Sequence, residues 1–132
     1  MNDRGSTTPL VLAILVGGAL LMAVTVDLGR LAATHTEAQR AARAGAEAGA
    51  AVVSVEAAYQ GRLEVDPVRA GETAQNAALA ARPRGGRSAT VAADRTSVCV
   101  RVRQVFEPGP ARAVGARATV VTATACASPR SG

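Results

Sequence analysis

The sequence has almost no aromatic residues and no lysine. It contains no Trp, one Tyr and one Phe, and every basic side chain is an Arg. Single-stranded nucleic acids are bound by stacking of the bases on aromatic side chains, so this chain lacks such a platform. Large side chains also dominate the energy of a core, and the apolar residues here are mostly Ala and Val. A domain of this composition has a thin core that needs a staple or a partner.

Residues suited to metal or acid–base chemistry are equally scarce. The only His is His35, and the two cysteines, Cys99 and Cys126, do not have zinc-site spacing. Gly85 and Gly86 lie in an Arg- and Pro-rich stretch, which is not the setting of a phosphate-binding loop. The carboxylates are scattered and form no pair of acid and base. We therefore expect a protein that is not an enzyme, uses no cofactor, and has no nucleic-acid or small-molecule substrate.

The longest feature is an uncharged run from Leu10 to Val26. With the two residues before it, this run forms a helix of about 28 Å, close to the thickness of the hydrocarbon core of a bilayer. A buried core helix of this length would need a larger protein around it. A signal peptide cleaved near Ala33 is the other alternative, but its apolar region is usually shorter. We expect a stub of residues 1–9 followed by a single membrane span.

Residues 31–60 predict that this helix continues beyond the membrane. They are rich in Ala, the best helix former, and contain no Pro, and Gly61 would end the helix near Tyr59. The second unit is therefore residues 10–60. Small residues recur along it at a spacing that lets helices approach closely, although an Ala-rich composition alone also produces such spacings. The residues for which we predict packing against other helices are Gly17, Ala41, Gly45 and Gly49.

The third unit, residues 61–132, is predicted to be a small α+β domain outside the cytoplasm. Gly71 to Ala81 reads as a short helix. Beyond it the apolar period changes to two, which indicates strands at Ala89 to Ala93, Ser97 to Phe106 and Val114 to Ala127. The fold class is therefore α+β: a long transmembrane and extended helix, then a short helix and a small antiparallel sheet.

The cysteines select a register for the last two strands. If Cys99 lies opposite Cys126, then Val100 and Val102 share an apolar face with alanines, and Arg101 faces the other way. A slip by one residue would mix the two faces. We predict a Cys99–Cys126 disulfide that stabilises the domain by roughly 3 kcal/mol; the alternative is two free buried thiols. A disulfide needs an oxidising compartment, which places this domain outside the cytoplasm.

Three features occur in order over residues 3–51: a charged pair before the apolar run, an Asp-x-Gly-Arg motif after it, and an Ala/Gly tail. They are Asp3-Arg4, Asp27-Leu28-Gly29-Arg30 and Ala46 to Ala50. In this order they resemble the N-terminal region of TadE/TadG-like proteins of tight-adherence (Flp-type) pilus assembly systems, of actinobacterial type. The resemblance does not extend to the C-terminal domain.

The resemblance implies a single-pass, pilin-like protein of the cytoplasmic membrane, acting as a minor pilin or assembly factor for cell adhesion. Its partners would be other pilin-like proteins, contacted through the N-terminal helix. In some relatives prepilin peptidase cuts after a Gly with a Glu five residues on. Here Gly5-Ser6 is the candidate site, and Leu10 stands where the Glu would be. Asp27 and Arg30 would mark the membrane interface as an i, i+3 ion pair.

The sequence thus favours a structural protein of a Flp/Tad-type pilus or a related secretion apparatus. A second hypothesis comes from its charge. The net charge is +5, and residues 61–132 carry eleven Arg against five acidic residues. A basic surface attracts acidic partners, so a secreted or anchored module that binds an acidic ligand is the alternative.

Overall fold

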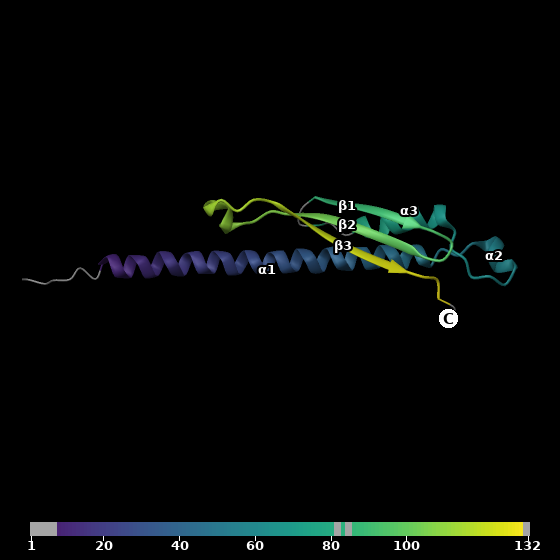
Figure 1. The fold of residues 1–132 in the computed structure, drawn as a ribbon, viewed down its shortest axis with the longest axis horizontal. Coiled ribbons are helices and arrows are strands. Elements are labelled where there is room, and N and C mark those ends of the chain that lie inside the picture. The colour runs from purple at the N-terminus through teal and green to yellow at the C-terminus, as the bar shows by residue number, and fades with distance from the viewer. Residues whose placement is uncertain (1–7, 81–82, 84–85, 131–132) are drawn as a thin grey trace, which may run out of the picture.

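The chain forms one long helix with a small α/β layer packed along part of it, as Figure 1 shows for the computed structural model. The structure describes residues 8–80, 83 and 86–130. Helix α1 runs from Thr8 to Ala50, and the three-stranded sheet lies beside its C-terminal half. The fold class is α+β, as the sequence predicted.

Helix α1 has two halves with different surroundings. The side chains of residues 8–22 are all exposed, and Asp27 is the first buried residue. From there the buried positions recur every three or four residues, which is one face of a helix. They are Asp27, Thr34, Ala38, Ala41, Ala42, Gly45, Ala46, Gly49 and Ala50. The first half of α1 therefore has no cover from the described part of the chain.

The end of α1 differs from the prediction. The helix stops at Ala50 instead of continuing to Tyr59, and a separate short helix, α2, spans Val55–Tyr59. Two local contacts explain the break. Val53 forms an isolated antiparallel bridge with Val65, and the Ser54 hydroxyl caps α2 by accepting a hydrogen bond from the backbone N–H of Ala57. The high helix propensity of residues 31–60 did not reveal these two contacts, which compete with a continuous helix.

Helix α3 spans Pro67–Leu79 and starts four residues earlier than predicted. The Asp66 carboxylate accepts hydrogen bonds from the backbone N–H groups of Val68 and Arg69, at 3.2 and 3.3 Å. Pro67 occupies the first turn, where its missing N–H leaves no bond broken. The Asp66-Pro67 pair is therefore the start signal of this helix. The predicted end at Ala81 lies outside the described residues.

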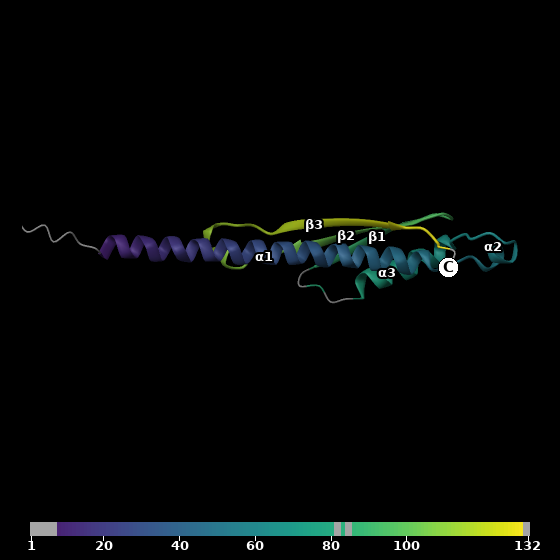
Figure 2. The same ribbon diagram turned by 90° about the horizontal axis from the view of Figure 1, so that it is seen from below.

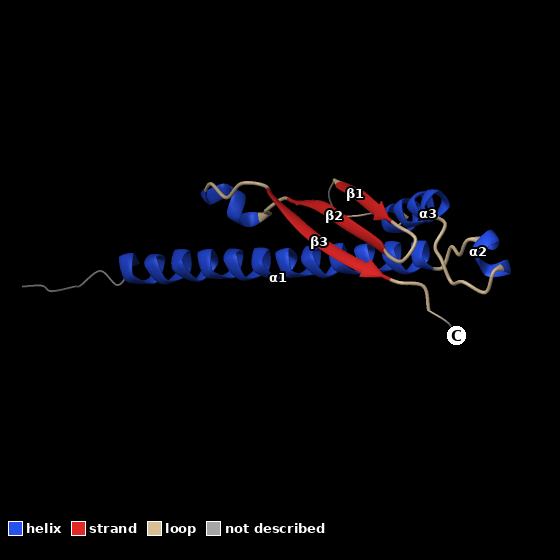
Figure 3. Cartoon of the chain, turned by 45° about the vertical axis from the view of Figure 1, so that its right-hand side comes forward, coloured by secondary structure: helices blue, strands red, loops and turns tan. Residues whose placement is uncertain are grey.

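Three antiparallel strands form a sheet with the order β1–β2–β3. They are β1 (Arg87–Ala93), β2 (Val98–Phe106) and β3 (Thr119–Ala127), seen side by side in Figure 3. The predicted register is confirmed, since Cys99 pairs with Cys126 and Val100 pairs with Ala125. The two sulfur atoms are bonded at 2.09 Å. The third strand begins later than the predicted Val114, because residues 110–114 form a 3-10 helix, η1 (Pro110–Val114).

The core is built from alanine and valine. One face of the sheet and helix α3 both lie against α1, as the two views in Figures 1 and 2 show together. The side chains at the centre are small, so the backbones come close to each other. The fully buried apolar residues include Ala38, Ala42, Ala46, Ala70, Ala74, Ala78, Val65, Val98, Val100 and Val102.

The glycines of α1 allow this close approach. A Cβ atom on Gly45 would lie 2.8 Å from the carbonyl oxygen of Ala74, and one on Gly49 would lie 2.9 Å from the Ala74 Cβ and from Val98. Together with the buried Ala41, these residues were predicted to pack against the helix of a partner. That prediction is wrong for all three, because α3 and the sheet of the same chain cover them.

Adding one methyl group at this contact should destabilise the domain. We expect Gly45→Ala and Gly49→Ala each to lower the free energy of unfolding by about 1–3 kcal/mol, since the contact has no room for a Cβ. The matched control is Gly29→Ala on the same helix, where nothing lies within 4 Å of the added Cβ. That change should be neutral or stabilise by about 0.5–1 kcal/mol. Urea unfolding of the full chain in detergent micelles measures both, and equal stability of all variants would contradict the packing described here.

Candidate functional site

The first half of α1 carries most of the exposed large apolar side chains of the described chain. Its leucines, valines and methionine are all exposed; Met22, for example, is 73% exposed. The most apolar window has a mean hydropathy of 2.5 and none of it is buried. By length and composition this helix can cross a membrane, and a signal sequence would meet the same criterion. Gly17 lies within it with open space around it, so its predicted packing against another helix stays a prediction.

The hairpin between β2 and β3 reaches back to α1 at the end of the apolar run. The Asp27 carboxylate accepts hydrogen bonds from the backbone N–H groups of Gly109, at 2.9 Å, and Ala111, at 2.8 Å. These groups belong to the first turn of η1, whose N–H groups would otherwise be unpaired. Asp27 is only 6% exposed. One side chain of α1 thus fixes a loop that is more than 80 residues away in the sequence.

The other residues of the Asp-x-Gly-Arg motif contribute less. The guanidinium of Arg30 lies 3.7 Å from the Asp27 carboxylate, so the predicted i, i+3 ion pair is present, with Arg30 half exposed. Gly29 has nothing within 4 Å of the position of a Cβ. The candidate processing residues Gly5 and Ser6 lie outside the described residues. The motif therefore acts mainly through Asp27, a role that sequence reasoning missed.

Removing the Asp27 carboxylate should release the hairpin from α1. In Asp27→Ala, the amides of Gly109 and Ala111 lose their acceptor, a loss of about 1–3 kcal/mol at this contact. We expect their hydrogen exchange to become about ten- to a hundred-fold faster, while the amides of β2 stay protected. Gly29→Ala is the control, because nothing lies within 4 Å of the added Cβ. Unchanged exchange at both amides in Asp27→Ala would show that something else holds the hairpin.

A second polar cluster joins four elements inside the domain. Arg87 of β1, whose side chain is 1% exposed, donates to the Glu37 carboxylate at 2.8 Å and to the Gln104 amide oxygen at 2.9 Å. Its guanidinium also donates to the backbone oxygen of Ala78 in α3. The Gln104 amide in turn donates to Glu37 at 3.3 Å. This cluster is the polar centre of an otherwise apolar contact between α1, α3 and the sheet.

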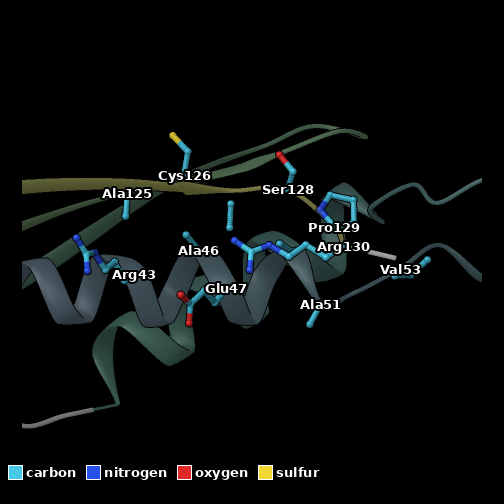
Figure 4. Close-up of a pocket in the computed structure, with 12 residues that line it drawn as sticks. Arg43, Ala46, Glu47, Ala51, Val53, Ala125, Cys126, Ser128, Pro129 and Arg130 are labelled. Carbon is cyan, nitrogen blue, oxygen red and sulfur yellow. The ribbon is translucent and has the colours of Figure 1, made fainter. Parts of the chain in front are cut away.

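An open groove lies between the end of α1 and β3, drawn in Figure 4. It has a volume of about 650 Å³ and is lined by alanines, two arginines, Arg43 and Arg130, and one acid, Glu47. The sulfur of Cys126 points away from α1 in Figure 4 and is held in the disulfide. The lining residues contain no histidine and no free thiol. The groove therefore offers charge and shape but no pair of nucleophile and base.

The remaining titratable groups form no metal-binding cluster in the part that the structure describes. No three His, Cys, Asp or Glu residues there lie close enough together to hold a metal ion. His35 lies on the exposed surface of α1, where its Nε2 is 2.9 Å from the side-chain amide of Gln39.

The turn between β1 and β2 holds the Asp94 carboxylate in several hydrogen bonds. The backbone N–H and hydroxyl of Thr96 and the backbone N–H of Ser97 donate to its carboxylate, which lowers the pKa of Asp94. A carboxylate whose pKa is lowered by folding stabilises the fold above its unfolded-state pKa and loses this effect as the pH falls through the lower, folded-state pKa. We expect an NMR pH titration to give Asp94 a midpoint below the ordinary value of an aspartic acid. An ordinary midpoint for Asp94 would contradict this turn geometry.

Comparison with family models, with curated proteins and with solved structures finds no match to this chain.

Proposed function

We propose that the chain is a structural, membrane-anchored, pilin-like subunit or assembly factor of a Flp/Tad-type pilus or a related secretion apparatus. The observation that carries the proposal is the division of α1. One half is apolar and uncovered, and the other half is built into a compact domain. Such a helix needs lipid, or the helices of other subunits, around its first half. The function is structural and not catalytic.

Two further features support this proposal. The motif at Asp27, Gly29 and Arg30 lies where the uncovered half of α1 ends, as expected from the resemblance to TadE/TadG-like proteins. The disulfide between Cys99 and Cys126 favours an oxidising compartment for the domain. The domain would then be outside the cytoplasm, with a single span in the cytoplasmic membrane.

The decisive experiment is genetic and uses the native host. Deletion of the gene should abolish fibres or secretion, and the wild-type gene should restore them. Gly17→Leu fills open space on the span without touching the domain, so we expect it to reduce assembly while the protein level stays unchanged. Met22→Leu is the control, since it conserves size on an exposed position. Normal fibres and secretion in the deletion strain would overturn the proposal.

An intact-mass measurement on native membranes separates the two variants of the proposal. A chain shortened by cleavage after Gly5 would be a processed pilin that enters a fibre. An uncut chain would be an assembly factor that stays in the membrane. A chain that begins just after Ala33 would have lost its apolar run, and the anchor would be rejected.

One observation favours the alternative, an anchored module that binds an acidic ligand. Arg101 and Arg103 lie on the solvent face of the central strand and have no ion-pair partner among the described residues. Their neighbours across the sheet carry hydroxyl groups: Thr90, Ser88, Thr124 and Thr122. Arginine side chains with hydroxyl neighbours suit the recognition of phosphate or carboxylate groups.

Polyphosphate binding by the full chain in detergent micelles tests this alternative. It predicts affinity that falls with salt and that is lost in the double variant Arg101→Ser/Arg103→Ser. The control removes the same charge elsewhere on the domain, in Arg69→Ser/Arg95→Ser, two exposed arginines of α3 and of the turn between β1 and β2. An equal loss in both double variants would show general attraction by net charge and not a site on the sheet.

A further inference from the structure

We propose that the tip of the β2–β3 hairpin, residues 107–118, is a second membrane contact that binds the anionic headgroups of phospholipids. The proposal rests on the membrane anchor inferred above and goes beyond it. The anchor concerns α1 alone, whereas this contact belongs to the domain. It would give the chain two points of attachment to one leaflet.

The position of the tip follows from Asp27. This residue comes directly after Val26, the last residue of the uncharged run, and its carboxylate holds the N–H groups of Gly109 and Ala111. One turn nearer the N-terminus, Ala23 is half-buried within the otherwise exposed run. Figures 1 and 2 both show η1 beside this part of α1. If the run fills the hydrocarbon core, the tip lies at the level of the headgroups.

The side chains of the tip suit the headgroup region of a membrane. Arg112 and Arg117 are exposed, and neither has an ion-pair partner among the described residues. Val114 is 64% exposed. Glu107 is the one acid in the segment. Guanidinium groups form paired hydrogen bonds to phosphate oxygens, and each basic residue near an anionic membrane strengthens its attachment about five-fold. An apolar side chain between two arginines is typical of a segment that lies in the interface.

The geometry also explains why this loop is tied down. A hairpin tip with exposed arginines would otherwise be free to move away from the membrane. The buried Asp27 carboxylate accepts hydrogen bonds from backbone N–H groups of the tip. The contact therefore leaves the side chains of the tip available. The side chains of Arg112 and Arg117 are therefore not needed for the contact with α1.

Spin labels on the full chain, reconstituted into single-chain lipid nanodiscs with the native disulfide intact, test the proposal. One cysteine is introduced at a time: Val114→Cys in the tip, Leu15→Cys in the apolar run, and Thr122→Cys on the solvent face of β3. Collisions with oxygen report lipid, and collisions with a water-soluble nickel chelate report water. We expect the Val114→Cys label to lie between the other two, in the headgroup region of nanodiscs that contain phosphatidylglycerol.

The result separates this inference from the anchor. A label at Leu15→Cys that meets only water would reject the anchor itself. The Leu15→Cys label could lie in lipid while the Val114→Cys label collides with the nickel chelate as often as the Thr122→Cys label does. That result would reject the lipid contact and leave the anchor. A Val114→Cys label shielded from both reagents would show that protein covers the tip, and this would also overturn the proposal.

The charge requirement is tested with the labelled tip in two lipid compositions. In discs of phosphatidylcholine alone, the Val114→Cys label should be more exposed to water than in discs with phosphatidylglycerol. Arg112→Ser/Arg117→Ser should remove this difference, and Arg69→Ser/Arg95→Ser, with the same loss of charge on α3 and the turn between β1 and β2, should retain it. A tip whose depth does not depend on lipid charge would overturn the headgroup assignment.

Discussion

Replacing Arg87 with alanine should lower the free energy of unfolding more than any other single substitution considered for this chain. The Arg87 guanidinium is buried and binds both Glu37 and Gln104. Its removal leaves two groups without their donor, the fully buried Gln104 amide oxygen and the Glu37 carboxylate, whose side chain is 26% exposed. The two losses together cost about 3–5 kcal/mol. A small domain has a total stability of about 5–15 kcal/mol. Urea unfolding of the full chain in micelles, followed by far-UV circular dichroism, measures the loss.

Two variants make the result specific. Arg101→Ala removes an arginine from the neighbouring strand on its solvent face and should change stability by less than about 0.5 kcal/mol. A triple variant, Arg87→Met/Glu37→Leu/Gln104→Leu, replaces the whole cluster with apolar side chains and should recover most of the stability. If Arg87→Ala were no less stable than Arg101→Ala, the cluster would have no role in holding the sheet to α1.

Loss of the disulfide should have the next largest effect. Cys99 and Cys126 close a loop with a sequence separation of 27, and the chain-entropy argument gives a stabilisation of about 3.5 kcal/mol for such a loop. The double variant Cys99→Ser/Cys126→Ser should lower the urea midpoint accordingly. The cysteines lie on the solvent face of the sheet, so the substitution leaves the core packing unchanged and the effect comes from the link alone.

Reduction of the wild-type protein provides the matching control. Since Cys126 is exposed, a thiol reductant should reach the bond in the folded protein. The reduced wild type and the double serine variant should then have the same urea midpoint. A midpoint for the double variant equal to that of the oxidised wild type would mean that the bridge does not stabilise the domain.

The sheet was the most predictable part of the fold. The alternation of Val98, Val100 and Val102 with arginines defined the two faces of β2, and the cysteines defined its partner in β3. The two patterns agreed on one register. Because side chains alternate with a period of two, a slip by one residue would move every side chain to the wrong face. Positions within a strand could be predicted because each depends only on its neighbours along and across the sheet.

Features that depend on distant partners could not be predicted. The small residues Gly45 and Gly49 indicated close packing correctly, but the pattern does not say whether the partner belongs to the same chain. Arg87 ends the Arg- and Pro-rich stretch around Gly85 and Gly86, yet it is buried against Glu37, 50 residues away. A signal did exist: Gln104 lies on the same face of β2 as the buried valines, and a polar group there requires a partner.

Asp27 carried no signal of its second role. Its place at the end of the apolar run explained it as an interface residue, and the ion pair with Arg30 seemed sufficient. The Pro-Gly-Pro loop contains only a few backbone N–H groups, and which acceptor they meet depends on the length and twist of the hairpin. A contact that joins residues 27 and 109 is a property of the tertiary fold.

The alanine core has a mechanical consequence. Alanine has no side-chain rotamers, so residues such as Ala38, Ala42, Ala70 and Ala74 lose no rotamer freedom on folding. For the same reason they cannot adjust to a shift of their neighbours, as a methionine would by rotating its bonds. The sheet, α3 and the second half of α1 should therefore move as one stiff body. A force applied to the domain would therefore be transmitted to the apolar half of α1 with little deformation in between.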